Sequence, residues 1–214
     1  MKRGLFLTFE GIDGAGKTTQ IGLLEKKLAR QGIASLFVRE PGSTQVGEKI
    51  RQILLTPENK GMAPATEILL YAAARAQIVT EKIRPALDEG KMVVCDRYIH
   101  SSLAYQGFGL GYAQEKIKMI NGEATGGLWP DLTFVFDIEV AESSRRIDRK
   151  EDRRAGKDRI EQRDSGFYNR VRQGYLALAA GDPERMVVIP SHLSIEEAHA
   201  TIWEELKGRV TIGT

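Results

Sequence analysis

Short apolar runs recur along the chain and alternate with longer segments in which apolar residues return every three or four positions. The short runs predict buried strands, and the spacing in the longer segments predicts amphipathic helices. Strands are expected at residues 5–9, 36–38, 92–96, 132–137 and 186–189. Helices are expected between a glycine loop and Gln31, at 46–54 and 65–89, from Val140, through Phe167 to Leu178, and at 195–206. Alternating strands and helices favour an α/β domain with both faces of its sheet covered.

The size and composition of the chain fit a single domain. It has 214 residues, and 31 Lys and Arg against 29 Asp and Glu give a net charge of +2, so no global field favours nucleic acid or a membrane surface. The single cysteine, Cys95, excludes a disulfide framework. Residues 1–4 run into the first predicted strand with no apolar h-region or small-residue cleavage site, and no run of 18 apolar residues occurs. We therefore expect a soluble cytoplasmic protein with no nucleic-acid or membrane partner.

A glycine-rich loop follows the first predicted strand. Residues 11–18 match G-x-x-x-x-G-K-[ST], a pattern in which backbone N–H groups and the following helix N-terminus hold phosphate. In such loops the lysine, here Lys17, reaches the β- and γ-phosphates, and the hydroxyl of Thr18 binds Mg²⁺. The predicted nucleotide-binding residues are Gly11, Ile12, Asp13, Gly14, Ala15, Gly16, Lys17, Thr18 and Thr19. A glycine turn that matches by chance is the alternative.

Charged and aromatic residues follow the second strand and the next helices. Arg39, Glu40 and Arg51 are expected at the carboxyl edge of the sheet, where ligands bind, although a solvated Arg/Glu pair explains the first two equally well. Tyr71 and Arg75 are four residues apart, so both lie on one face of the predicted helix. They could meet one ligand there, or form a surface cation–π pair.

Two predicted strands end in an aspartate that could help to hold Mg²⁺. Both 92–96, ending at Asp96, and 132–137, ending at Asp137, have this form, and the pattern alone does not choose between them. Only the first is followed by a dense set of polar side chains, at 97–107, which suits a polar ligand. A mixed run of eleven Lys/Arg and seven Asp/Glu at 140–172 is typical of a solvated helix face and not of a nucleic-acid patch.

With these residues in view, nearly the whole chain resembles the bacterial thymidylate kinases. The matching strings are FEGIDGAGKTT at 9–19, REPG at 39–42, LYAAAR at 70–75, DRYIHSSLAYQG at 96–107 and DRIE at 158–161. The resemblance implies a P-loop kinase fold with a five-stranded parallel sheet, helices on both faces and a mobile lid at about 148–160, in one domain that forms a homodimer. It also implies transfer of the γ-phosphoryl group of MgATP to dTMP, giving dTDP and ADP.

The resemblance also implies roles for individual residues. Tyr71 matches an aromatic that stacks on thymine, and Arg75 an arginine that hydrogen-bonds the base. Residues implied on the acceptor side are Glu40, Arg51, Tyr71, Arg75, Arg97, Ser102, Tyr105 and Gln106. Of the other residues expected to be catalytic, Asp96 and Arg97 match a pair beside the transferring phosphoryl group, Lys17 reaches the β- and γ-phosphates, and Asp13 matches an acid near the acceptor. Thr18 and Asp96 are expected at Mg²⁺.

In one branch of the family an arginine in the phosphate loop can contact the transferring phosphoryl group, but the loop of this chain contains no arginine. A second branch supplies that arginine from the lid. Arg149, Arg153 and Arg154, followed by Arg159, lie in that segment.

Two rival functions stay open. One is another nucleoside monophosphate kinase. The other is a P-loop switch protein, although the guanine-reading string N-K-x-D of many GTPases is absent.

Overall fold

A five-stranded parallel sheet runs through the middle of the molecule. The computed structural model describes residues 3–149 and 158–209. The strands lie in the order β2-β3-β1-β4-β5, and every neighbouring pair is parallel. Their bounds are β1 Phe6–Glu10, β2 Ser35–Arg39, β3 Met92–Asp96, β4 Leu132–Asp137 and β5 Met186–Pro190. The expected α/β fold and sheet are therefore confirmed, and the predicted strand ends differ from the observed ones by at most one residue.

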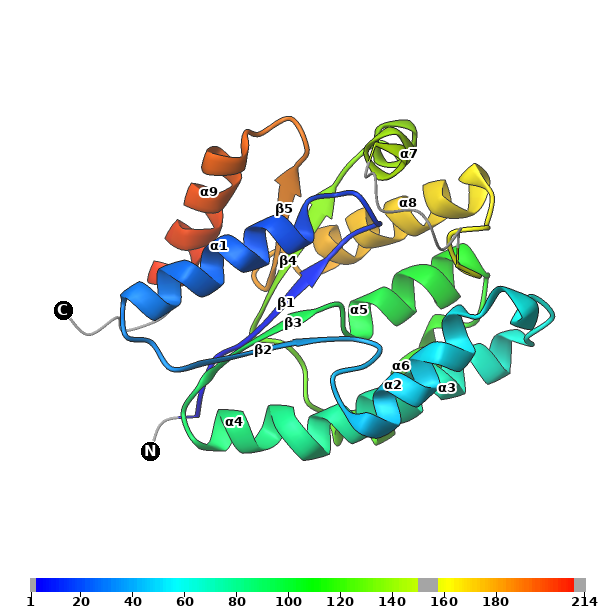
Figure 1. Cartoon of the computed structure of the whole chain (residues 1–214), viewed down its shortest axis with the longest axis horizontal. Coiled ribbons are helices and arrows are strands. Elements are labelled where there is room, and N and C mark those ends of the chain that lie inside the picture. Colours follow the sequence, from blue (N-terminus) through cyan, green and yellow to red (C-terminus); the bar gives the residue numbers. More distant parts are fainter. Residues whose placement is uncertain (1–2, 150–157, 210–214) are drawn as a thin grey trace.

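Helices cover both faces of this sheet, with α1 and α9 on one side and α4 on the other (Figure 1). Their bounds are α1 Lys17–Arg30, α2 Gln45–Leu55, α3 Pro64–Ile78, α4 Arg84–Asp88, α5 Ile99–Ser102, α6 Gln114–Thr125, α7 Val140–Asp148, α8 Ser165–Gly181 and α9 Ile195–Lys207. Polar side chains cap several N-termini, as in the reciprocal pair of Ser194 and Glu197 at α9. Within residues 3–149 and 158–209, no helix is both long and apolar enough to cross a membrane.

Alternate residues of the central strands enter two separate cores. Leu7 and Phe9 of β1 pack with α1, α8 and α9, whereas Phe6 packs with α3, α4 and α6. Because side chains alternate along a strand, a strand covered on both faces must be apolar at nearly every position. This requirement explains the continuous apolar runs seen in the sequence.

The register of the central strands gathers their carboxyl ends. Phe9 of β1 and Arg39 of β2 both pair with Asp96, the last residue of β3. The residues that follow these positions, in the phosphate loop, at Glu40 and at Arg97, therefore emerge at one edge of the sheet. Ligands of open α/β sheets bind at this edge.

The predicted helix at 65–89 is interrupted by a π-helical segment. α3 ends at Ile78, Val79–Ile83 is π-helical with the Arg84 N–H bonded to the Val79 carbonyl, and α4 follows. Pro85 has no N–H for the usual bond four residues back, so the wider turn accommodates it. A second π-helical segment, Leu103–Gly109, and helix α6 were not predicted.

Candidate active site

The glycine loop joins β1 to α1 and borders a large cavity. This loop cavity has a volume of about 590 Å³, and its lining includes residues 13–20, Asp96 and Arg97. Gly11 has a φ of 128°, and a Cβ there would lie 2.5 Å from the Phe136 carbonyl oxygen, so only glycine fits. Gly16, with a φ of 103°, turns the chain into α1. The loop therefore directs backbone N–H groups and a helix N-terminus toward the cavity, which suits phosphate.

Lys17 lies inside this loop and is 6% exposed. Its Nζ donates hydrogen bonds to the carbonyl oxygens of Gly11 and Ile12, each at 3.0 Å. Burial, together with the nearby charge of Arg97, lowers the pKa of Lys17 to about 8, although Asp13 opposes the shift. An anion in the loop cavity would stabilise the charged ammonium.

Two oxygen-bearing side chains of the loop cavity fit a divalent cation. Asp96 Oδ1 is buried and has no hydrogen-bond partner among the described residues, and Thr18 is exposed at the start of α1. Mg²⁺ prefers oxygen ligands and is held by few protein groups when it also binds phosphate. Within the described residues no group of three or more His, Cys, Asp or Glu side chains is placed to hold a metal ion. Thr19 is exposed and lines the same cavity.

Arg97 connects the phosphate loop to a second cavity. It adopts a φ of 70°, which is uncommon for a residue with a side chain, and donates to the Gly11 carbonyl at 2.9 Å and to Asp13 Oδ1 at 2.8 Å. Burial alone would raise the pKa of Asp13, but Arg97 and Lys17 outweigh it and lower that pKa to about 2. A charged pair thus stands at the boundary between the cavities.

Glu10, the last residue of β1, supports the turn that carries Arg97. It was not among the residues predicted to be functional. It is fully buried and accepts hydrogen bonds from the Tyr98 N–H, the Ser101 hydroxyl and the Tyr175 hydroxyl. Burial raises its pKa, with these donors and Arg97 opposing. The carboxyl group fixes the turn after β3 that carries Arg97.

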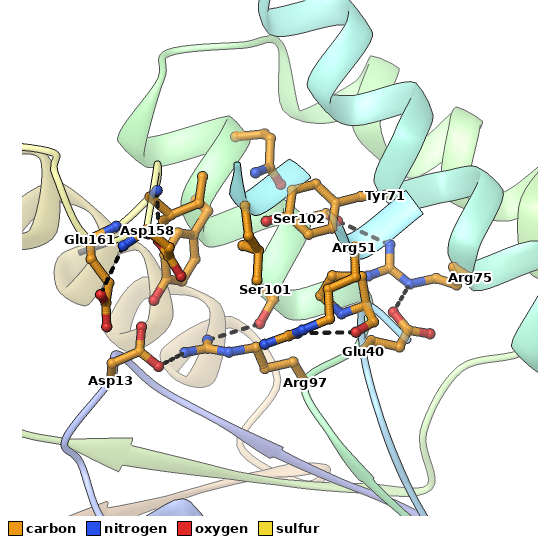
Figure 2. Close-up of a pocket in the computed structure, with 15 residues that line it drawn as sticks. Asp13, Glu40, Arg51, Tyr71, Arg75, Arg97, Ser101, Ser102, Asp158 and Glu161 are labelled. Carbon is orange, nitrogen blue, oxygen red and sulfur yellow. Dashed lines mark hydrogen bonds and ion pairs between the residues drawn. The ribbon is translucent and has the colours of Figure 1, made fainter. Parts of the chain in front are cut away.

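The second cavity, which we call the Tyr71 cavity, has a volume of about 200 Å³. In Figure 2, Asp13, Arg97 and Glu40 lie along one side of it and the ring of Tyr71 lies on the other. All predicted acceptor-side residues line it: Glu40, Arg51, Tyr71, Arg75, Arg97, Ser102, Tyr105 and Gln106. The structure thus brings together side chains from the turn after β2, from α2 and α3, and from the segment after β3. It also adds Asp158, Ile160 and Glu161 of the DRIE string, which had not been assigned a role.

Arg75 lines this cavity, is 1% exposed and donates four hydrogen bonds through its side chain. Its Nε donates to Glu40 at 2.7 Å and its Nη1 to the Ser102 hydroxyl at 2.9 Å. Asn121 and the Tyr98 carbonyl accept further bonds. Burial raises the pKa of Glu40 to about 7, opposed by Arg75. Such a network holds the guanidinium rigidly at the cavity wall.

Tyr71 and Arg75 belong to a longer pattern on α3. Glu67, Tyr71 and Arg75 are spaced by four residues, so they line one face of the helix. Glu67 is 1% exposed and buried behind the cavity. The sequence shows only the four-residue spacing of this acid from Tyr71, and Glu67 was not predicted as a site residue.

The expected lid arginines are only partly described. Arg149 is exposed at the end of α7, whereas Arg153 and Arg154 lie outside the described residues. Arg159 is buried, bonded to Glu67 and to the Leu54 carbonyl, and lines neither the loop cavity nor the Tyr71 cavity. Of the four arginines of which at least one was expected to close over MgATP, Arg159 is therefore held away from both cavities in this structure. Arg146, which was not singled out, does line the loop cavity.

The turn between β5 and α9 closes the far side of the loop cavity. Pro190, Ser191, Leu193, Ser194 and Ile195 line it there. This turn is distant in sequence from the glycine loop and carries no recognised motif. Its position beside the loop cavity could therefore not be predicted from the sequence.

Comparisons with known proteins agree with this geometry. The family model described as thymidylate kinase matches residues 9–202. A thymidylate kinase of Exiguobacterium sibiricum is 49% identical over 203 residues, covering 95% of this chain and 94% of its own. One from Caldanaerobacter subterraneus is 48% identical, covering 96% of this chain and 98% of its own. The crystal structure of thymidylate kinase from Ehrlichia chaffeensis superposes with a TM-score of 0.77 at 32% identity, covering 96% of this chain and 99% of that one.

Proposed function

Because the chain belongs to the thymidylate kinase family, we propose that it transfers the γ-phosphoryl group of MgATP to dTMP, giving dTDP and ADP. One observation carries the proposal: the loop cavity and the Tyr71 cavity meet, so two nucleotides would bind with their phosphates adjacent. The lining residues common to both are Asp13, Glu40, Arg51, Arg97 and Glu161. A donor and an acceptor held in line at this junction need little further chemistry.

The loop cavity is the proposed ATP site. Backbone N–H groups of the glycine loop would bind the phosphates, and Lys17 would exchange its carbonyl partners for β- and γ-oxygens. Thr18 and Asp96 would hold Mg²⁺, which when bound neutralises charge on those phosphates. Arg97 would stabilise the charge that develops on the transferring group.

The Tyr71 cavity is the proposed dTMP site. Tyr71 offers a flat face for the base, Arg75 a fixed donor, and Arg51 a cation for the phosphate, with its Nη1 now bonded to the Pro41 carbonyl at 3.0 Å. The acceptor phosphate has a second pKa of about 6, so it is mostly a nucleophilic dianion at neutral pH. No strong general base is required, and the difficulty to be overcome is the repulsion between two anions.

The segment at about 148–160 is the proposed lid of a single domain spanning 1–214. We expect Arg149, Arg153 or Arg154 to reach the γ-phosphoryl group when ATP binds, since the phosphate loop has no arginine. In cis or in trans, arginine fingers contribute about 10³–10⁵ in kcat. Single alanine substitutions should lower kcat more than either KM, and retention of kcat within about threefold in all three would contradict the lid role.

We further propose that the enzyme is a cytoplasmic homodimer. Exposed apolar side chains lie on α2, α3 and α6 and support a surface for a second copy: Val46, Ile53, Leu69 and Met119. Sedimentation velocity tests this arrangement. The double substitution Leu69→Glu with Met119→Glu should yield monomers, and an unchanged dimer would place the interface elsewhere.

A coupled assay of ADP release tests the proposed reaction. With MgATP as donor, dTMP should be the best acceptor among dTMP, dUMP, UMP, CMP and AMP, with a kcat of about 1–100 s⁻¹ typical of kinases. A faster rate with CMP or AMP would identify another nucleoside monophosphate kinase. Hydrolysis of ATP without transfer to any acceptor would indicate a nucleotide switch.

A further inference from the structure

Glu67 binds three side chains from two distant parts of the chain through one buried carboxylate. Its Oε1 accepts a hydrogen bond from Gln106 Nε2 at 2.8 Å. Its Oε2 accepts from Arg159 Nη1 at 2.7 Å and from Arg163 Nη2 at 2.6 Å. Gln106 is one of the residues lining the Tyr71 cavity, whereas Glu67 lies behind it. The Glu67 carboxylate therefore contacts a residue that lines the Tyr71 cavity, Gln106, without lining the cavity itself.

This contact determines which end of the Gln106 amide faces the cavity. A carboxylate between two guanidinium groups only accepts hydrogen bonds, so Gln106 must present its NH₂ group to Glu67. The carbonyl oxygen of the same amide then points away from Glu67. Because the side chain is 2% exposed and lines the cavity, its polar group available to a ligand is an acceptor.

We propose that Glu67 is a positioning residue that fixes the Gln106 amide, so that the Tyr71 cavity selects a base carrying an N–H at its ring nitrogen. Thymine and uracil carry that N–H, whereas cytosine has a lone pair at the same position. A cytosine would therefore set two acceptors against each other, and unpaired polar groups in a closed site are strongly disfavoured. This inference rests on the proposed dTMP site and gives a physical origin for its choice of base.

The same carboxylate has a structural role that must be separated from this one. Arg159 and Arg163 each keep one buried nitrogen without a partner among the described residues, so their pairing with Glu67 matters for the segment at 158–164. Loss of that pairing would lower stability and activity with every acceptor. Only a changed orientation of the Gln106 amide would alter the preference for thymine over cytosine.

The Glu67→Gln substitution tests the orientation. If the new carbonyl oxygen stays with the two arginines, its NH₂ group replaces Oε1 and turns Gln106 around, so that an N–H donor faces the cavity. The kcat/KM ratio of dTMP to 5-methyl-dCMP, which shares its methyl group, sugar and phosphate, should then fall about tenfold or more. The Arg163→Lys variant changes only the Oε2 side and should keep that ratio within about threefold.

Two results would overturn the proposal. One is a folded Glu67→Gln enzyme that keeps the wild-type ratio within threefold. The other is an equal fall in Arg163→Lys, which would show general loosening of the site. A fall confined to Glu67→Gln supports the proposal.

A measurement on the wild-type enzyme covers the case in which Glu67→Gln does not fold. The side-chain NH₂ of Gln106, assigned in NMR spectra by its loss in Gln106→Met, should exchange with solvent at least about tenfold more slowly than that of the exposed Gln31. Exchange at the rate of Gln31 would refute the Glu67 contact. This readout needs no turnover, so it stands even if dTMP is not the acceptor, and the two proposals fail separately.

Discussion

The phosphate loop and the Tyr71 cavity bind their proposed ligands in opposite ways. The loop consists of consecutive residues, and its binding groups are mostly backbone N–H groups placed by glycine conformations. The Tyr71 cavity is built from side chains of several elements, locked by buried pairs such as Arg75 with Glu40. A substitution in the loop should therefore change binding locally, whereas one in the cavity should also disturb the fold.

The largest expected effect is that of Arg75→Ala. It leaves Glu40 buried without its cation, and breaking such pairs costs about 3–5 kcal/mol in unfolding free energy. Urea unfolding measures this loss, and the KM for dTMP should rise while that for ATP changes little. Arg39→Ala is the control, because its pair with Glu48 is half exposed and worth under about 1 kcal/mol. Equal losses in both variants would remove the distinction between a buried and an exposed network.

The next effect is that of Lys17→Ala on the loop side. Removal of one positioned charge at a transferring group costs about 10²–10³ in kcat, while thermal unfolding should change less than in Arg75→Ala. Single-turnover kinetics with saturating MgATP measure the loss. Lys26→Ala, an exposed lysine of the same helix, should behave as wild type. A folded Lys17→Ala enzyme with normal kcat would contradict the assignment of the loop.

Tyr71→Ala probes the cavity with a smaller change. Stacking of a base on an aromatic ring is worth about 1–3 kcal/mol, so dTMP binding should weaken by roughly ten- to hundredfold. Titration calorimetry with dTMP measures this, and Tyr71→Phe should keep most of the affinity because the ring remains. If Tyr71→Ala instead weakened ATP binding, the two cavities would have been assigned in the wrong order.

The smallest effect is a pH dependence specific to the loop. Burial lowers the pKa of Lys17 to about 8 in the free enzyme, so above that pH a growing fraction is neutral and binds phosphate poorly. The value of kcat/KM for ATP should fall toward tenfold per pH unit, whereas kcat should stay level to higher pH because bound phosphate stabilises the ammonium. A parallel decline of both parameters would assign the titration to another group.

The local elements could be predicted from the sequence more fully than the contacts between them. The strands around Phe9 and Val94 were identified because double-sided burial requires unbroken apolar runs. The glycine loop was identified because its geometry depends on neighbouring residues. Glu10 and Glu67 were missed since a buried acid resembles a surface acid until its partners, Tyr98 or Arg159, are placed beside it. The π-helical segments leave no periodic signal of their own.

The four-residue spacing of Glu67, Tyr71 and Arg75 restricts the insertions and deletions that α3 can tolerate. Each residue added to a helix rotates the rest of that helix by about 100°. A one-codon insertion between Glu67 and Arg75 would therefore leave every residue type in place yet turn either the carboxylate or the guanidinium away from Tyr71. The turn at Pro57–Asn59 just before α3 has no such restriction, because its side chains are at least partly exposed. Over evolutionary time, insertions and deletions should accumulate in that turn, while this stretch of α3 keeps a constant length.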